Sequence, residues 1–209
     1  MKRSFDIVVA SVALVMMTPL LLVIAIAIKL DSRGPVIFRQ RRIGLGGGAF
    51  SIYKFRTMVA KRDRDQVNVS AAGDVRVTRV GRVLRNTFLD EVPQLFNVLR
   101  GDMSLVGPRP ETPEHVDLYT EEELVVLSVR PGMAGPSALA YHDEEEILAG
   151  HDDPHTYYVN HLMRERVRLD LGYLELASLR YDIAMLFRTI FVAVIGVKAS
   201  DEVLAERKA

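Results

Sequence analysis

The strongest pattern in the chain is an uncharged apolar run near its start. From Ile7 to Ile28 the sequence IVVASVALVMMTPLLLVIAIAI contains no charged residue. About 20 apolar residues suffice for a helix to cross a bilayer. The run is too long for a cleaved signal peptide, and no A-x-A-like site follows it. We therefore predict a membrane helix over residues 1–30.

Two features of this run favour a segment that enters the membrane and returns by the same face. Pro19 lies inside the run and should kink the helix. Basic residues flank both ends, with Lys2 before the run and Lys29 after it, and positive residues mark the cytoplasmic side. A re-entrant helix-break-helix satisfies both ends. Ser11 and Thr18 could supply hydrogen bonds to backbone groups freed at the break.

The segments after the membrane helix predict a β-hairpin. VIFRQRRI and AFSIYKFRTM have the length and composition of short strands, and the glycines at 44 and 46–48 suit the turn between them. Glycine-rich loops can also cradle phosphates. This one lacks the G-x-x-x-x-G-K-[ST] spacing and leads into no helix, so a hairpin turn is the better interpretation.

The stretch NTFLDEVPQLFN, residues 86–97, predicts the start of a helix. Pro93 is tolerated only in a first helical turn, where its missing N–H costs nothing. The helix should begin near Thr87 to Asp90 and stop at Gly101. The pattern further predicts a helix over residues 111–129, a loop or short strand at 133–141, and a partly helical acidic segment after it. Residues 178–197 favour a helix at the membrane interface or in the core.

These elements together give an α/β fold class that is mostly helical. We expect a re-entrant membrane helix-break-helix at 1–30 and a membrane-associated catalytic domain at 31–198 that combines a small antiparallel hairpin or sheet with interfacial helices. A tail follows at 199–209.

Composition narrows the function. The 209 residues include no cysteine, which excludes disulfides and thiolate zinc sites. The net charge is zero, but basic residues predominate between Lys29 and Arg109 and acidic residues after it. The basic part is expected to meet phosphates, a lipid surface or nucleic acid. Nucleic acid is disfavoured, because aromatic residues are not interleaved with the basic ones and the apolar run would serve no such role.

The candidate chemistry lies at the predicted helix start. Asp90 and Glu91 are adjacent there, and the structural interpretation is that Asp90 caps the helix and Glu91 faces its positive end. The functional interpretation is that the two adjacent carboxylates form part of a site. Arg85 precedes the pair. Arg109 is held between two prolines, a stiffness that suits an arginine aimed at an anion and would equally suit a rigid turn.

The motifs, taken in their order along the chain, resemble a known family. After the proline-containing membrane segment come GPVIFRQRRIG, YKFRTM, LRNTFLDEVPQLFNVLRGDMSLVGPRP and RPGMAG. This series resembles the bacterial sugar transferases, also called monotopic phosphoglycosyl transferases, in a minimal catalytic form. The resemblance implies transfer of a sugar 1-phosphate from a UDP-sugar to polyprenol (undecaprenyl) phosphate, with release of UMP. The expected place is the cytoplasmic face of the bacterial inner membrane, in the first membrane step of glycoconjugate or exopolysaccharide assembly.

The resemblance also implies roles for individual residues. Asp90 is the expected nucleophile of a ping-pong mechanism, and Glu91 is its partner in a dyad that binds Mg²⁺. Arginine matches phosphate oxygens bidentately, and four basic side chains are candidates for binding them: Arg85, Arg109, Lys54 and Arg56. The expected partners are a UDP-sugar, polyprenol phosphate and membrane lipid, without nucleic acid. The membrane-facing surface leaves room for a homodimer.

One segment departs from the family pattern. Many relatives have G-[IL]-T-G-[WL]-x-Q-V where this chain has GMAGPSALAYHDEEE, so the resemblance does not define the sugar. An alternative from another class is a membrane-anchored scaffold or binding protein whose charged motifs are structural. It predicts no turnover of a UDP-sugar and no need for Asp90.

Overall fold

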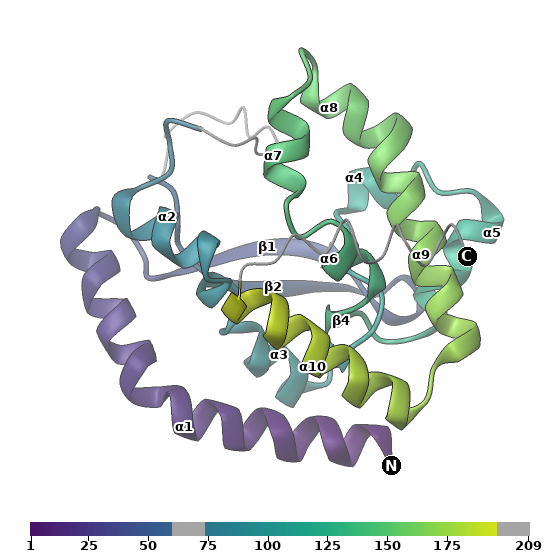
Figure 1. The fold of residues 1–209 in the computed structure, drawn as a ribbon, viewed down its shortest axis with the longest axis horizontal. Helices are drawn as coiled ribbons and strands as arrows, with labels where there is room; N and C mark the ends of the chain where they lie inside the picture. Colours follow the sequence, from purple (N-terminus) through teal and green to yellow (C-terminus); the bar gives the residue numbers. More distant parts are fainter. Residues whose placement is uncertain (60–73, 196–209) are drawn as a thin grey trace.

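The computed structural model in Figure 1 describes residues 1–59 and 74–195. It is mostly helical, as expected, with two small two-stranded sheets. The predicted tail at 199–209 lies outside the described residues.

The first sheet is the predicted hairpin. Strand β1 (Ile37–Ile43) pairs antiparallel with β2 (Ala49–Phe55). The turn uses Gly46 at φ 63° and Gly47 at φ 79°, a left-handed backbone that glycine adopts without steric cost. The glycines therefore serve the chain reversal, and the hairpin prediction is confirmed.

The helix predicted from near Thr87 to Asp90 up to Gly101 is present, but it begins later than expected. Helix α2 (Arg79–Asn86) is followed by a separate 3₁₀ turn over Leu89–Glu91, and α3 (Gln94–Arg100) begins directly after Pro93. Gly101 ends α3 at φ 91°, the usual left-handed helix stop. The side chain of Asn97 in α3 forms hydrogen bonds with the backbone of β2 at Ser51 and Tyr53.

Helix α1 (Lys2–Asp31) corrects the expected helix-break-helix. It is one continuous helix with Pro19 inside it, and Figure 1 shows it as bent. A proline removes one backbone hydrogen bond and displaces one carbonyl, so the helix can continue on both sides. The Thr18 hydroxyl donates to the Leu14 carbonyl at 2.7 Å, whereas Ser11 makes no hydrogen bond from its side chain within the described part of the chain.

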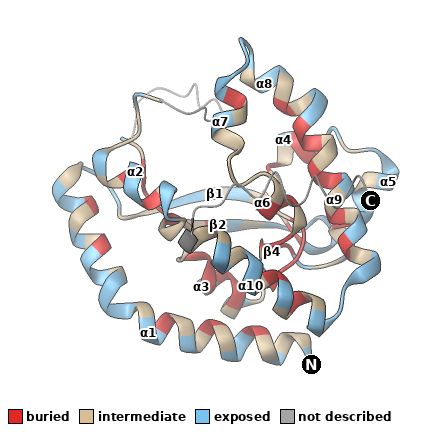
Figure 2. Ribbon diagram, in the orientation of Figure 1, coloured by how far each residue is buried: buried red, intermediate tan, exposed pale blue. Residues whose placement is uncertain are grey.

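Both ends of α1 are bonded to the same globular body. Near its start, the Arg3 guanidinium donates to the Val98 carbonyl of α3 at 2.6 Å. At its end, the Arg56 guanidinium donates to the Ser32 carbonyl at 2.7 Å. Among the described residues, α1 is the one helix long and apolar enough to cross a membrane. Its outer face, pale blue in Figure 2, exposes large apolar side chains: Ile7, Val8, Val12, Val15, Met16, Leu20, Leu22, Val23, Ile26 and Leu30.

The parallel pairing of the second sheet was not predicted. The loop or short strand expected at 133–141 overlaps its second strand at residues 133 and 134, and most of the remaining segment is helical instead. Strand β3 (Ser104–Val106) pairs parallel with β4 (Gly132–Ala134). The two backbones approach so closely that a Cβ added at Gly132 would lie 2.1 Å from the Gly107 nitrogen. Glycine is needed at this position because no side chain fits there.

The single helix predicted over 111–129 is wrong, because the chain forms three short helical pieces there. They are α4 (Pro113–Val116), α5 (Glu121–Leu124) and a 3₁₀ turn over Val125–Ser128. Thr120 starts α5 with a reciprocal capping box to Glu123, which marks a new helix rather than the middle of one.

The remaining helices complete the body. In order they are α6 (Pro136–Ala140), α7 (Glu144–Ala149), α8 (Pro154–Tyr157), a π-helical turn (Tyr158–Leu162), α9 (Met163–Leu176) and α10 (Leu179–Ile195).

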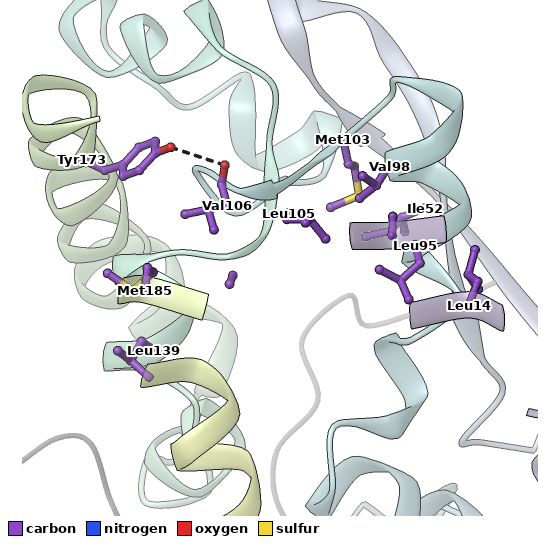
Figure 3. Close-up of a cluster of buried hydrophobic side chains, with 12 residues drawn as sticks. Leu14, Ile52, Leu95, Val98, Met103, Leu105, Val106, Leu139, Tyr173 and Met185 are labelled. Carbon is purple, nitrogen blue, oxygen red and sulfur yellow. Dashed lines mark hydrogen bonds between the residues drawn. The ribbon is translucent and has the colours of Figure 1, made fainter. Parts of the chain in front are cut away.

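The main core lies between α1, β2, α3, both strands of the parallel pair, α6, α9 and α10. Figure 3 shows its side chains, with Met103 and Val98 fully buried among them. Met185 of α10 is buried in this core, while Phe187 and Phe191 of the same helix are exposed. Helix α10 is therefore a core helix on one face and exposes apolar side chains on the other.

Candidate active site

Asp90 and Glu91 lie on the 3₁₀ turn between α2 and α3. Phe88 leads into this turn at φ 55° and ψ 14°, a left-handed conformation that is strained for a bulky residue and is common at functional sites. Neither carboxylate caps α3, because its N-cap is Pro93 without a side-chain cap. The capping interpretation of Asp90 is therefore wrong.

Glu91 is held by two basic side chains from distant parts of the chain. Its Oε1 accepts from Lys54 Nζ at 2.7 Å and from Arg109 Nη2 at 3.2 Å. Burial alone would raise the pKa of Glu91, but the charges and hydrogen bonds of Lys54 and Arg109 outweigh it and hold the pKa well below its usual range. Glu91 is therefore ionised and fixed in orientation.

Asp90 has a different environment although it is the next residue. It is 9% exposed, and its carboxylate makes no hydrogen bond within residues 1–59 and 74–195. Burial raises the pKa of Asp90 to about 6, against the lowering effect of Lys54, and the neighbouring Glu91 charge raises it further. Glu91 is therefore a fixed anion, whereas the carboxylate oxygens of Asp90 remain available to a ligand.

Arg85 lies beside the dyad with two tethers of its own. Its Nε donates to Thr57 Oγ1 at 3.0 Å, and its Nη1 donates to Glu145 Oε1 of α7 at 2.6 Å. Its charge also lowers the pKa of Asp90. The structure thus brings Arg85 into the group that the sequence analysis proposed.

Arg56 is not brought into this group. Its guanidinium is buried at the end of α1, where it donates to the carbonyls of Ile28 and Ser32. Although Arg56 is only two residues from Lys54, it serves the attachment of the membrane helix.

The loop that carries Arg109 is held on both sides. The Pro108 carbonyl accepts from the Gly132 N–H at 2.8 Å, and the Pro110 carbonyl accepts from Arg42 at 3.2 Å. The stiffness expected from the two prolines is thus reinforced by neighbouring strands, which fixes the backbone from which Arg109 reaches Glu91.

Two contributors to the site escaped the sequence analysis, Thr57 and Glu145. Neither residue belongs to a sequence motif that indicates a functional site. Glu145 lies in the run DEEE, which from sequence is indistinguishable from a solvated acidic helix start. Its partner is 60 residues away, so only the tertiary structure reveals its position.

The carboxylates of Asp90 and Glu91 suit a metal ion that is also bound by oxygens of a substrate. Within the described residues, no group of three or more histidine, cysteine, aspartate and glutamate side chains could hold a metal ion. Magnesium commonly binds through one or two carboxylates together with substrate phosphate oxygens. The available Asp90 oxygens and the adjacent Glu91 carboxylate supply such a pair.

Comparison with known proteins identifies the family. A family model described as bacterial sugar transferase matches residues 1–196. The chain therefore belongs to the bacterial sugar transferase family.

Individual relatives make the class more specific. The chain is 43% identical over 192 residues to a UDP-glucose:undecaprenyl-phosphate glucose-1-phosphate transferase of Caulobacter vibrioides, covering 90% of this chain and 68% of that protein. It is 39% identical over 198 residues to a UDP-N-acetylgalactosamine-undecaprenyl-phosphate N-acetylgalactosaminephosphotransferase of Aeromonas hydrophila, covering 93% of this chain and 44% of that protein. The exopolysaccharide production protein ExoY of Rhizobium meliloti is 38% identical, with 90% of this chain and 83% of that protein covered. This chain spans less than half the length of the Aeromonas relative.

Proposed function

We propose that this protein transfers a sugar 1-phosphate from a UDP-sugar to polyprenol phosphate and releases UMP. The observation that carries the proposal is the divided carboxylate pair, in which Glu91 is fixed by Lys54 and Arg109 while Asp90 keeps its oxygens available. The Caulobacter and Aeromonas relatives are named for UDP-linked sugars and undecaprenyl phosphate, which supports the same substrate classes here.

The reaction proceeds in two displacements at one phosphorus. A carboxylate oxygen of Asp90 attacks the phosphorus that bears the sugar, a new O–P bond forms, and the bond to UMP breaks with its electron pair leaving on UMP. A phosphate oxygen of the polyprenol phosphate then attacks the same phosphorus. The Asp90 carboxylate is regenerated, and the product is polyprenol diphosphate sugar. The acyl phosphate divides one difficult transfer into two easier ones.

The surrounding cations lower the barrier to an anion attacking an anion. Lys54 and Arg109 lie at Glu91, beside the nucleophile, and Arg85 lies within electrostatic reach of Asp90. Guanidinium groups bind phosphate oxygens in pairs and stabilise charge that develops on them. Mg²⁺ held by Asp90 and Glu91 would supply further charge neutralisation on the phosphates.

The attachment of α1 supports a re-entrant path with the catalytic body on the cytoplasmic face of the bacterial inner membrane. Both ends of α1 bond to the same body, through Arg3 and Arg56. A straight span would carry one end to the opposite side of the bilayer, about 30 Å away, and would break those bonds. We therefore propose that residues 1–30 dip into the cytoplasmic leaflet and return.

Release of UMP tests the function. Purified protein is given polyprenol phosphate, Mg²⁺ and each member of a panel of UDP-sugars, and UMP is measured over time. Turnover with at least one sugar supports the transferase and identifies the sugar. A binding or scaffold protein gives no UMP with any sugar in the panel.

The nucleophile is tested separately. Asp90→Asn should abolish both UMP release and covalent labelling by UDP-sugar radiolabelled in the sugar, with an unchanged far-UV circular dichroism spectrum. Glu91→Gln should slow turnover by about 100-fold or more, because it loses the fixed anion beside the nucleophile. An Asp90→Asn protein with near-normal turnover would remove Asp90 from the mechanism.

A further inference from the structure

A buried carboxylate outside the dyad ties the active-site loop to the rest of the body. Asp170 of α9 is 3% exposed. Its Oδ2 accepts from the Arg109 N–H at 2.9 Å and from Ser137 Oγ at 2.7 Å, and its Oδ1 accepts from the Ser137 N–H at 3.3 Å. All three partners are donors, so the site requires an acceptor on both oxygens.

These donors come from two loops that leave one end of the parallel sheet. Arg109 follows β3, and Ser137 follows β4 at the start of α6. Carboxyl ends of adjacent parallel strands lie at one edge of a sheet, where α/β proteins build their sites. Asp170 therefore joins the two loops at the edge from which Arg109 reaches the dyad.

The connection continues to the catalytic pair. The Arg109 backbone is fixed by Asp170, and its Nη2 donates to Glu91 Oε1 at 3.2 Å. One helical turn before Asp170, the buried Arg166 pairs with Glu144 of α7. The adjacent Glu145 pairs with Arg85. Helix α9 thus contacts the loop that carries Arg109 and also α7, whose Glu145 binds Arg85.

We propose that Asp170 is a positioning residue for the transfer reaction: it fixes the Arg109 backbone against the start of α6, so that the guanidinium meets Glu91 in the orientation that binds phosphate. This rests on the proposed function, since it assigns the phosphate contact to Arg109. The role needs the carboxylate, because an asparagine would turn an N–H group toward the Arg109 or the Ser137 donors and would leave one of them unsatisfied.

A double-mutant cycle separates positioning from mere stability. Asp170→Asn, Arg109→Ala and the double variant are assayed for UMP release, with kcat and KM determined for the UDP-sugar. Asp170→Asn alone should lower kcat by about 10- to 100-fold, as expected when a binding group is misplaced by about 1 Å. In the Arg109→Ala background the same substitution should cost almost nothing. Equal losses in both backgrounds would overturn the proposal.

Asp6→Asn is the matched control. Asp6 is 2% exposed and also accepts from a serine hydroxyl, Ser104 Oγ at 2.9 Å, and from a backbone N–H, that of Leu105 at 3.3 Å. It lies at the opposite end of β3 from Arg109, so its variant should lose stability while kcat stays near the wild-type value. A drop in kcat equal to that of Asp170→Asn would show that loss of any buried carboxylate lowers turnover, and it would overturn the positioning role of Asp170.

Two further outcomes are decisive. If Asp170→Asn does not fold, Ser137→Ala replaces it in the same cycle, because it removes one donor to Asp170 Oδ2 and keeps the carboxylate.

If the wild-type protein releases no UMP, the proposed function fails, and the positioning is then judged on the crystal structure of Asp170→Asn. Loss of the Arg109–Glu91 contact, which is 3.2 Å in the wild type, supports the positioning, and its retention overturns it.

Discussion

Replacing Asn97 with alanine tests the contact that joins α3 to the hairpin. Asn97 is fully buried. Its Oδ1 accepts from the Tyr53 N–H at 3.0 Å, and its Nδ2 donates to the Ser51 carbonyl at 2.7 Å. Alanine leaves both backbone groups of β2 without their partner. At about 1–2 kcal/mol for each stranded, partly buried group, the unfolding free energy should fall by about 2–4 kcal/mol.

The assay is thermal unfolding in detergent, followed by far-UV circular dichroism. For a protein of this size each kcal/mol lowers the midpoint by about 2–4 °C, so Asn97→Ala should unfold about 4–16 °C below the wild type. Asn86→Ala is the control, since Asn86 is exposed at the end of α2 and its loss should change the midpoint little. A variant at position 97 that unfolds within about 2 °C of the wild type would refute the argument that these groups depend on Asn97.

The same variant should lose activity below its unfolding temperature. Lys54 follows Tyr53 on β2 and donates to Glu91, which lies on the turn before α3. Asn97 holds β2 and α3 together. Loosening β2 from α3 therefore moves Lys54 relative to the dyad. Turnover at a temperature where the variant is fully folded should fall below the wild-type value, and an unchanged rate would limit the role of Asn97 to stability.

The remaining predictions concern the arginines, pH and the membrane helix. Arg109→Lys and Arg85→Lys should each lower kcat/KM by about tenfold or more, because a lysine ammonium cannot bind two phosphate oxygens as the planar guanidinium does. Wild-type kinetics in both variants would show that neither arginine binds the substrate. Burial raises the pKa of Asp170 to about 6 from 3.8 and outweighs the hydrogen bonds from Ser137 and Arg109, which favour the ionised form. Between pH 4 and about 6 Asp170 is therefore protonated in the folded state and ionised in the unfolded state, so stability falls as pH rises through that interval; above it the ionised carboxylate accepts all three hydrogen bonds. Urea titrations should show the wild type losing stability relative to Asp170→Asn over that interval, and a difference independent of pH would contradict the raised pKa. A cysteine at Lys2 should react with a membrane-impermeant reagent only in opened cells, and Pro19→Leu should shift part of the population to a form labelled from outside; labelling of the unaltered helix from outside would refute the re-entrant path.

The elements that local chemistry determines could be predicted from sequence. The hairpin follows from glycines between two short strand-like runs, and the end of α3 follows from Gly101. The start of α3 lies after Pro93 and not before it, because residues 89–91 form a separate 3₁₀ turn. The parallel pair of β3 and β4 could not be predicted, because each strand has three residues and is stabilised by a partner far along the chain. The helix predicted over 111–129 is interrupted because Thr120 forms a capping box with Glu123, which starts a new helix.

Some residues of the site could likewise be predicted from sequence, and others could not. The place of Asp90 and Glu91 beside Pro93 leaves a structural and a functional interpretation open, and it is the family resemblance that favours the functional one. The structure brings Lys54, Arg85 and Arg109 to this pair. Arg56 resembled these residues in charge and position, but its guanidinium lies at the end of α1. Charge alone cannot distinguish a substrate-binding arginine from one that fastens a helix, because the difference lies in which backbone carbonyls are near.

The tethers on Arg85 also affect the entropy of binding. A long side chain carries about 2 kcal/mol of rotamer entropy, which is lost when it is immobilised on a ligand. Thr57 and Glu145 already restrict the Arg85 guanidinium, and Glu91 does the same for Lys54 and Arg109. Much of the ordering therefore takes place during folding, before any diphosphate arrives. Weakening a tether should reduce affinity through added side-chain freedom, even where every charge in the site is kept.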